Sequence, residues 1–166
     1  MHVDKSAESQ ALDRFLALGH RCQYANGDVI ISAGDHSSEL FYLLEGSVSV
    51  QYEDTQGHEI ILAYLHEGEF FGEIGMLGED HERSAWVRSR HDSCVIHLPH
   101  DALQRMMTDS PELVFGLLAQ LATRVRDTSR KASALAFTDV AGRVARALLD
   151  LGQQPEAEVR PDGVKI

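Results

Sequence analysis

The chain has 166 residues, of which 43% are apolar and 25% charged, and its formal net charge at pH 7 is −11. This composition is typical of an ordinary water-soluble domain, because no apolar run approaches the roughly 18 residues that cross a bilayer and the N-terminus lacks the layout of a signal peptide. Nucleic-acid binding needs a basic face, so these residues alone are predicted to bind DNA poorly.

The first predicted element is a short amphipathic helix in residues 9–18, where apolar residues recur at helical spacing. Residues 21–99 then alternate short runs rich in Val, Ile, Tyr and Phe with turns that contain Gly or Asp. Short apolar runs separated by such regularly spaced turns predict an all-β sandwich or barrel. Within it, residues 47–52 and 59–65 flank a glycine-containing turn and are predicted to form a hairpin.

The two cysteines, Cys22 and Cys94, lie singly in strand-like segments of this β region. Two cysteines are too few for a disulfide framework or for a cluster ligated by cysteine. Because a free cysteine is usually buried, we expect two reduced core thiols and therefore a cytoplasmic protein.

Beyond Pro99 the apolar period becomes helical. A short helix is predicted for residues 101–108. A long helix is predicted from about residue 112 to 137, and Pro111 suits its start because the missing N–H is not needed there.

Thr138 and Asp139 are predicted to cap a fourth helix, which continues to Leu151 and ends at Gly152. The last residues, 164–166, are strand-like, and the sequence shows no partner strand beside them. A strand without a partner suggests that the native chain continues past this point.

The long helix carries an apolar seam with the spacing of a coiled coil. Its members are spaced 3, 4, 3, 4 and 3 residues apart: Leu118, Leu121, Val125, Thr128, Ala132 and Leu135. The seam either packs against the β region of the same chain or pairs two helices across a two-fold axis. Thr128 interrupts the apolar seam, and Arg124 and Ser129 lie beside it, so three polar groups share one turn.

A candidate site lies in the segments GEFFGEIGML, residues 68–77, and ERSAWVR, residues 82–88. One interpretation is an anion site, with glycines that allow close backbone approach, a short helix beginning near Glu73, and the donor fork of Arg83. Glu73 would accept a hydrogen bond from a sugar hydroxyl, which favours a nucleotide over inorganic phosphate. The other interpretation is an ion pair between Glu73 and Arg83. The residue types alone leave both interpretations open.

These two segments resemble the phosphate-binding cassette of cyclic-nucleotide-binding domains. The segments TSRKASALAFTDVAGRVARALLDL and QQPEAEVRPDGVKI resemble the dimer helix and hinge of bacterial cyclic AMP receptor proteins, also called catabolite activator proteins. The resemblance implies a mainly β fold with helices, in which a double-stranded β-helix (jelly roll) precedes a long dimerisation helix. It implies a nucleotide-binding roll in residues 1–110, the dimerisation helix in 111–137, and in 138–166 the hinge and start of an otherwise absent helix-turn-helix domain.

Carried over by position, the resemblance implies that cyclic AMP is the effector. Gly72 and Glu73 would hold the region of the ribose 2′-hydroxyl. Arg83 and Ser84, together with the N–H of Ala85, would hold the cyclic phosphate.

The resemblance also implies that the long helix completes the site. Arg124 would approach the phosphate or Glu73, Thr128 would hydrogen-bond the adenine amino edge, and Ser129 would reach the same base from the second subunit. The implied partners are a second copy of the chain and, through the full-length protein, DNA and RNA polymerase; no membrane partner is implied.

The alternative from another functional class is a metal-dependent enzyme with a β-roll fold. It is considered because the chain has nine histidines and histidine is the commonest metal ligand. They are scattered, with neither a His-x-His nor a His-x-x-x-His pair. No serine, cysteine or lysine lies in a recognisable nucleophile setting. We therefore predict neither enzymatic activity nor a metal site.

Other effectors remain as alternatives within the family. Iron–sulfur sensing needs more than two cysteines, and haem sensing would need a recruited axial ligand. A cyclic dinucleotide is a closer rival, although relatives that bind one tend to lose the serine after the arginine, and Ser84 is present. Regulatory subunits of kinases share the cassette but lack the hinge and tail of residues 138–162.

Overall fold

The computed structural model describes residues 5–78, 80–109, 111–137, 140–152, 158–160 and 163–165. The chain divides into two units, Met1–Leu121 and Ala122–Ile166. The helices of the first unit are α1 (Lys5–Leu18), α2 (Glu73–Leu77) and α3 (His100–Asp109). Its strands are β1 (His20–Tyr24), β2 (Val29–Ile31), β3 (Leu40–Glu45), β4 (Ser47–Glu53), β5 (Glu59–His66), β6 (Phe70–Phe71), β7 (Trp86–Ser89) and β8 (Ser93–Leu98).

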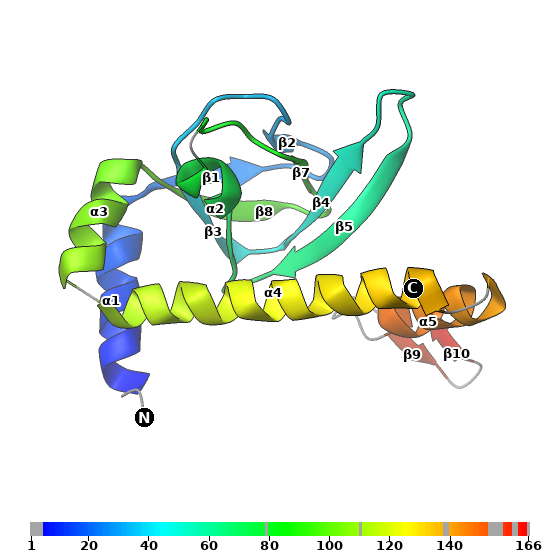
Figure 1. The fold of residues 1–166 in the computed structure, drawn as a ribbon. Coiled ribbons are helices and arrows are strands. Elements are labelled where there is room, and N and C mark those ends of the chain that lie inside the picture. Colours follow the sequence, from blue (N-terminus) through cyan, green and yellow to red (C-terminus); the bar gives the residue numbers. More distant parts are fainter. Residues whose placement is uncertain are drawn as a thin grey trace. The chain divides into compact units, whose positions relative to one another are not determined.

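The eight strands form two four-stranded antiparallel sheets, in the orders β1-β8-β3-β6 and β2-β7-β4-β5 (Figure 1). Phe41 and Leu43 of β3 belong to one buried cluster with Val48 of β4 and Val87 of β7. Because these strands come from different sheets, the cluster is the core between the two sheets. The predicted jelly roll is thus confirmed.

The opposite face of β3 is buried as well. Leu40 and Tyr42 alternate with the residues that point into the first core, and they join a second cluster with Phe15 of α1 and Leu103 of α3. Figure 1 shows α1, α3 and the beginning of the following helix gathered on this side of the sheet. Burial on both faces explains why the sequence of β3 is a continuous apolar run rather than an alternating one.

The predicted hairpin is confirmed as β4 and β5, which pair from Ser47↔His66 to Glu53↔Glu59. The Asp54 carboxylate closes the turn, since its Oδ1 accepts hydrogen bonds from the N–H groups of Gln56 at 2.8 Å and His58 at 2.9 Å. Because these bonds favour the ionised carboxylate, they lower the pKa of Asp54.

Strand β5 lies at the edge of its sheet. Three successive apolar side chains near its start are exposed: Ile60, Ile61 and Leu62. A register shift between Val50 and Gln51 of β4 interrupts the pairing of this segment. The outer part of the hairpin therefore presents apolar side chains outside the core of the chain.

The long helix α4 (Pro111–Phe137) begins at the predicted proline and runs from the first unit into the second. The second unit also contains α5 (Val140–Gly152), β9 (Glu158–Arg160) and β10 (Gly163–Lys165). Helix α5 ends at the predicted glycine, whereas the predicted caps Thr138 and Asp139 lie outside the described residues.

The expectation of a tail strand without a partner is wrong. Strand β10 pairs antiparallel with β9, in the register Gly163↔Arg160 to Lys165↔Glu158. The partner was not recognised because β9 has only three residues, all of them polar except Val159. So short a strand shows no alternation that a sequence pattern can detect.

Both cysteines have free thiols, Cys94 buried in β8 and Cys22 half-buried in β1. Among the described residues, none of the helices combines the length and apolar character needed to cross a membrane.

Candidate functional site

The candidate site is built where two loops pair. The N–H of Arg83 donates to the carbonyl of Asp35 at 2.8 Å, and the N–H of Gly34 donates to the carbonyl of Arg83 at 2.8 Å. Beside them, His36 and Glu82 form an isolated antiparallel bridge. The loop before β3 thus fixes the backbone from which the Arg83 side chain departs.

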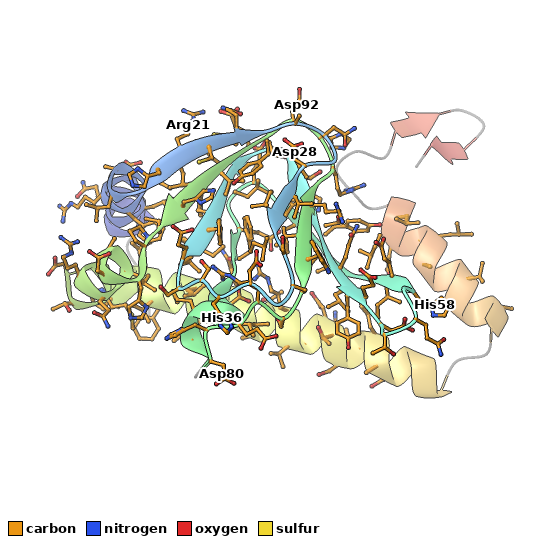
Figure 2. All side chains as sticks on the ribbon, turned by 90° about the horizontal axis from the view of Figure 1, so that it is seen from above. Arg21, Asp28, His36, His58, Asp80 and Asp92 are labelled. Atoms are coloured by element: carbon orange, nitrogen blue, oxygen red, sulfur yellow. The ribbon has the colours of Figure 1, made fainter. Side chains whose placement is uncertain are left out.

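A second set of contacts joins the same loops. The N–H of Ser37 donates to the carbonyl of His81 at 3.0 Å, and Nδ1 of His36 lies 3.1 Å from the carbonyl oxygen of Asp80. Figure 2 shows the His36 and Asp80 side chains at this end of the β-roll. The two loops are therefore tied together at Arg83 and at the three residues that precede it.

The Arg83 side chain is buried, with 3% of its residue surface exposed. Its Nη1 donates to the carbonyl of Gly72 at 2.6 Å, and its Nη2 donates to Ser37 Oγ and to the carbonyl of Glu39, each at 2.8 Å. The guanidinium carbon lies 5.2 Å from the centre of the Phe41 ring. All three acceptors are neutral oxygens, so these contacts use three of the five guanidinium N–H donors and leave the positive charge in place.

Burial lowers the pKa of the Arg83 guanidinium, and the carboxylates of Glu39, Glu73 and Asp35 oppose that shift. An arginine so placed still carries its proton at neutral pH. The site therefore keeps a buried cation with acidic side chains around it.

Two glycines form the surface on which this arginine lies. Gly72 has φ +81°, and a Cβ built there would lie 2.8 Å from Arg83 Nη1 and 2.8 Å from Cδ2 of Phe41. A Cβ on Gly75 would lie 2.9 Å from Arg83 Cδ. Such distances exclude any side chain at either position without movement of the arginine.

Glu73 is the first residue of α2 and is 6% exposed. The structure therefore brings Gly72, Glu73 and Arg83 together, as the sequence motif implied. Ser84 is exposed and Ala85 half-buried, and both directly follow Arg83 before β7 begins. That these five residues contact a ligand stays a prediction.

The three predicted contacts from the long helix lie in the second unit, on the C-terminal part of α4. Arg124 is half-buried, whereas Thr128 and Ser129 are exposed. Their contribution to the site stays a prediction as well.

The predicted dimer seam is exposed where its side chains are described in the second unit. Val125 is 66% exposed, and Thr128 and Ala132 are also exposed. The Leu135 side chain lies outside the described residues.

Sequence reasoning missed Ser37, Glu39 and Phe41. Ser37 and Glu39 lie in a polar loop, SAGDHSSE, between two apolar runs, and Phe41 follows it; such a loop indicates only a turn. Their relation to Arg83 depends on the pairing of two loops 46 residues apart. No local pattern in the sequence reports such a contact.

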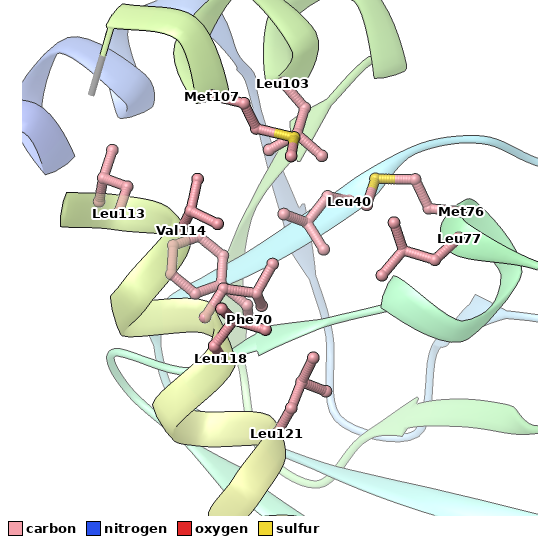
Figure 3. Close-up of a pocket in the computed structure, with 11 residues that line it drawn as sticks. Leu40, Phe70, Met76, Leu77, Leu103, Met107, Leu113, Val114, Leu118 and Leu121 are labelled. Atoms are coloured by element: carbon pink, nitrogen blue, oxygen red, sulfur yellow. The ribbon is translucent and has the colours of Figure 1, made fainter. Parts of the chain in front are cut away.

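An apolar cavity of about 110 Å³ lies within the first unit, next to α2 (Figure 3). Met76 and Leu77 of α2 line it, together with Leu118 and Leu121 from the seam of α4. The remaining lining residues come from β3, β6, α3 and the start of α4: Leu40, Phe70, Leu103, Met107, Leu113, Val114 and Leu117. Helix α2 therefore carries Glu73 of the candidate site and also forms part of this cavity's wall.

Among the residues that the structure describes, no group of three or more His, Cys, Asp and Glu side chains is placed to hold a metal ion.

Comparison with known proteins identifies the first unit. Residues 21–110 match the family model described as cyclic nucleotide-binding domain. The chain is 44% identical over 158 residues to the cAMP-activated global transcriptional regulator Vfr of Pseudomonas aeruginosa, a match that covers 93% of this chain and 74% of Vfr. It is 38% identical over 166 residues to the cAMP-activated global transcriptional regulator CRP of Escherichia coli O6:H1, covering all of this chain and 79% of that protein.

Solved structures agree with this assignment. The c-di-GMP responsive global regulator CLP of Xanthomonas campestris superposes with a TM-score of 0.88 at 36% identity, covering 93% of this chain and 77% of CLP. The catabolite activator protein of Thermus thermophilus superposes with a TM-score of 0.67 at 31% identity, and the match covers 88% of this chain and 68% of that protein. The similar proteins are regulators of transcription, whereas the effectors in their names differ.

Proposed function

This chain belongs to the CRP family of transcription regulators with a cyclic nucleotide-binding domain, and on that premise we propose that its β-roll binds cyclic AMP. The observation that carries the proposal is the buried Arg83 guanidinium. Three neutral oxygens accept its hydrogen bonds, and it packs against two glycines near the buried Glu73. As a member of this family the chain is a regulator and not an enzyme.

The chemistry of the site fits a cyclic nucleotide. A guanidinium has five N–H groups, and three of those of Arg83 donate to Gly72, Ser37 and Glu39. The Nε–H and the second hydrogen of Nη1 remain for a ligand. The cyclic phosphate carries one negative charge, which the retained cation attracts, while the Ser84 hydroxyl and the Ala85 N–H would add donors.

Glu73 suits the sugar rather than the phosphate. A carboxylate repels a phosphate but accepts a hydrogen bond from a ribose 2′-hydroxyl. Because Glu73 is almost completely buried, such a bond would form away from water and would favour a ribonucleotide.

Titration of this chain with cyclic AMP, cyclic GMP and cyclic-di-GMP in a calorimeter tests the effector. We expect cyclic AMP to bind most tightly and to raise the melting temperature, with 5′-AMP as a control that carries an extra negative charge. The second candidate is cyclic-di-GMP, which the likeness to CLP favours. Tighter binding of cyclic-di-GMP than of cyclic AMP would replace the first proposal by the second.

We further propose that the chain forms a homodimer through the seam of α4. Val125 is exposed, so Val125→Glu costs little in a monomer but places a charge in a helix pair. Sedimentation equilibrium at tens of micromolar should show a dimer for the wild type and a monomer for Val125→Glu. Thr123→Glu adds the same carboxylate at an exposed position outside the seam and should remain dimeric; a monomeric wild type, with and without nucleotide, would rule out the dimer.

In the full-length protein, the dimer would couple nucleotide binding to paired helix-turn-helix domains that bind successive major grooves about 34 Å apart. Because the full-length protein would act on chromosomal DNA with RNA polymerase, we propose that it works in the cytoplasm. A ligand shifts such an equilibrium only by its differential affinity for the two states. Contacts from both subunits, through Thr128 of one and Ser129 of the other, are one source of that difference.

The double variant Thr128→Ala with Ser129→Ala in the full-length protein is therefore expected to separate binding from signalling. Cyclic AMP should still bind with a modest loss, whereas its stimulation of operator binding should fall at least about tenfold. Thr123→Ala with Ser133→Ala, two exposed positions on the same helix, is the matched control. Full stimulation in the Thr128/Ser129 variant, measured by fluorescence anisotropy of operator DNA, would show that this turn does not carry the signal.

A further inference from the structure

The side chain of Ser37 is fixed next to the buried cation. Its Oγ accepts a hydrogen bond from Arg83 Nη2 at 2.8 Å and a longer one from the N–H of Glu39 at 3.4 Å. Its own N–H donates to the carbonyl of His81 at 3.0 Å. The hydroxyl oxygen is therefore held in place from both loops that form the site.

Ser37 differs in kind from the other two acceptors that hold the guanidinium. The oxygens of Gly72 and Glu39 are main-chain carbonyls, which no substitution at those positions removes. Among the described contacts of Arg83, the Ser37 hydroxyl is the acceptor that depends on the identity of a side chain. It is also neutral, so it orients the arginine without cancelling the charge that an anion needs.

We propose that Ser37 is a positioning residue for the effector site, a role that rests on the proposed function of Arg83. Both hydrogens of Nη2 are used by Ser37 and Glu39, which fixes the guanidinium plane and aims the Nε–H and the second Nη1 hydrogen toward the ligand. Without the hydroxyl, the guanidinium keeps its bonds to the carbonyls of Gly72 and Glu39 but loses one of the three contacts that fix its plane. The loss is one of preorganisation, because the arginine must be ordered when the nucleotide binds.

The test compares Ser37→Ala with Ser38→Ala, the adjacent half-buried serine, in calorimetric titrations with cyclic AMP. We expect Ser37→Ala to raise Kd about five- to tenfold, an effect within the range of one typical net hydrogen bond. Ser38→Ala should change Kd less than twofold, and Ser37→Thr, which keeps a hydroxyl, should restore most of the affinity. Equal effects of the two alanine variants would overturn the proposal.

A double-mutant cycle separates positioning from a general loss of structure. In the background of Arg83→Lys, which lacks the guanidinium, Ser37→Ala should leave Kd unchanged. A purely structural role of the loop would produce the same five- to tenfold loss in both backgrounds, and that result would also overturn the proposal.

A measurement on the nucleotide-free protein tests the role of Ser37 independently of the proposed effector. The Nε–H resonance of Arg83 in a ¹⁵N spectrum, assigned with Arg83→Lys, should shift and exchange faster with water in Ser37→Ala but not in Ser38→Ala. If the wild type bound no cyclic nucleotide, the proposed effector would fail while this spectrum still tested the positioning. An unchanged resonance in Ser37→Ala would refute the positioning even if cyclic AMP bound.

Discussion

Replacing Arg83 by leucine is expected to weaken cyclic AMP binding by about 2–4 kcal/mol, a loss of roughly 30- to 800-fold in affinity. The substitution removes a charge-assisted contact and leaves a phosphate without its buried cation. Isothermal calorimetry measures the loss. Arg88→Leu is the matched control, because Arg88 has the same charge and lies five positions on, with its guanidinium 5.4 Å from the Trp86 ring.

The same variant also changes the free protein. The carbonyls of Gly72 and Glu39 accept hydrogen bonds from Arg83, and a buried acceptor that loses its donor costs about 1–3 kcal/mol of unfolding free energy. Arg83→Lys keeps the charge and loses the fork, so it should bind with intermediate affinity and unfold closer to the wild type. The role of Arg83 in binding would be disproved if folded Arg83→Leu and Arg88→Leu bound cyclic AMP equally well.

Gly72→Ala is expected to reduce both stability and affinity. The alanine must adopt φ +81°, which costs about 1–2 kcal/mol, and its Cβ would meet Arg83 Nη1 and the Phe41 ring at 2.8 Å. Displacing the arginine or the ring adds an overpacking cost, so we expect a total loss of about 3 kcal/mol in unfolding free energy. Because the arginine is displaced, the Kd for cyclic AMP should rise more than tenfold.

Gly27→Ala isolates the contribution of backbone strain. Gly27 has φ +90°, and a Cβ there meets nothing within 4 Å. Denaturant titration should therefore show a smaller loss of stability for Gly27→Ala than for Gly72→Ala, with unchanged cyclic AMP affinity. Identical losses in the two variants would mean that strain alone limits position 72 and that the contact with Arg83 is unimportant.

Elements that depend on local pattern were predicted well from the sequence. The hairpin of β4 and β5 and the helix starting at Pro111 match their predicted bounds within one or two residues. Helix α1 begins at Lys5, four residues before the predicted start. That first turn lacks apolar periodicity in the sequence, so the pattern could not include it.

The candidate site was only half predictable. Gly72, Glu73 and Arg83 belong to two neighbouring segments of one motif, and their chemical types already favoured an anion or an ion pair. The structure shows that the hydrogen bonds of Arg83 go to neutral oxygens, two of them from residues 37 and 39. That arrangement follows from the pairing of two loops across the roll, which is a property of the tertiary fold.

The edge strand β5 has a consequence for how the protein must be handled and stored. Its segment EIILAYL contains no proline or glycine and one charge, and three of its apolar side chains are exposed at the sheet edge. Segments of this kind template cross-β aggregation when nothing covers them. Concentrated stocks of the protein are therefore expected to form fibril-like aggregates, and the rate of that self-association should fall when Ile61 is replaced by lysine.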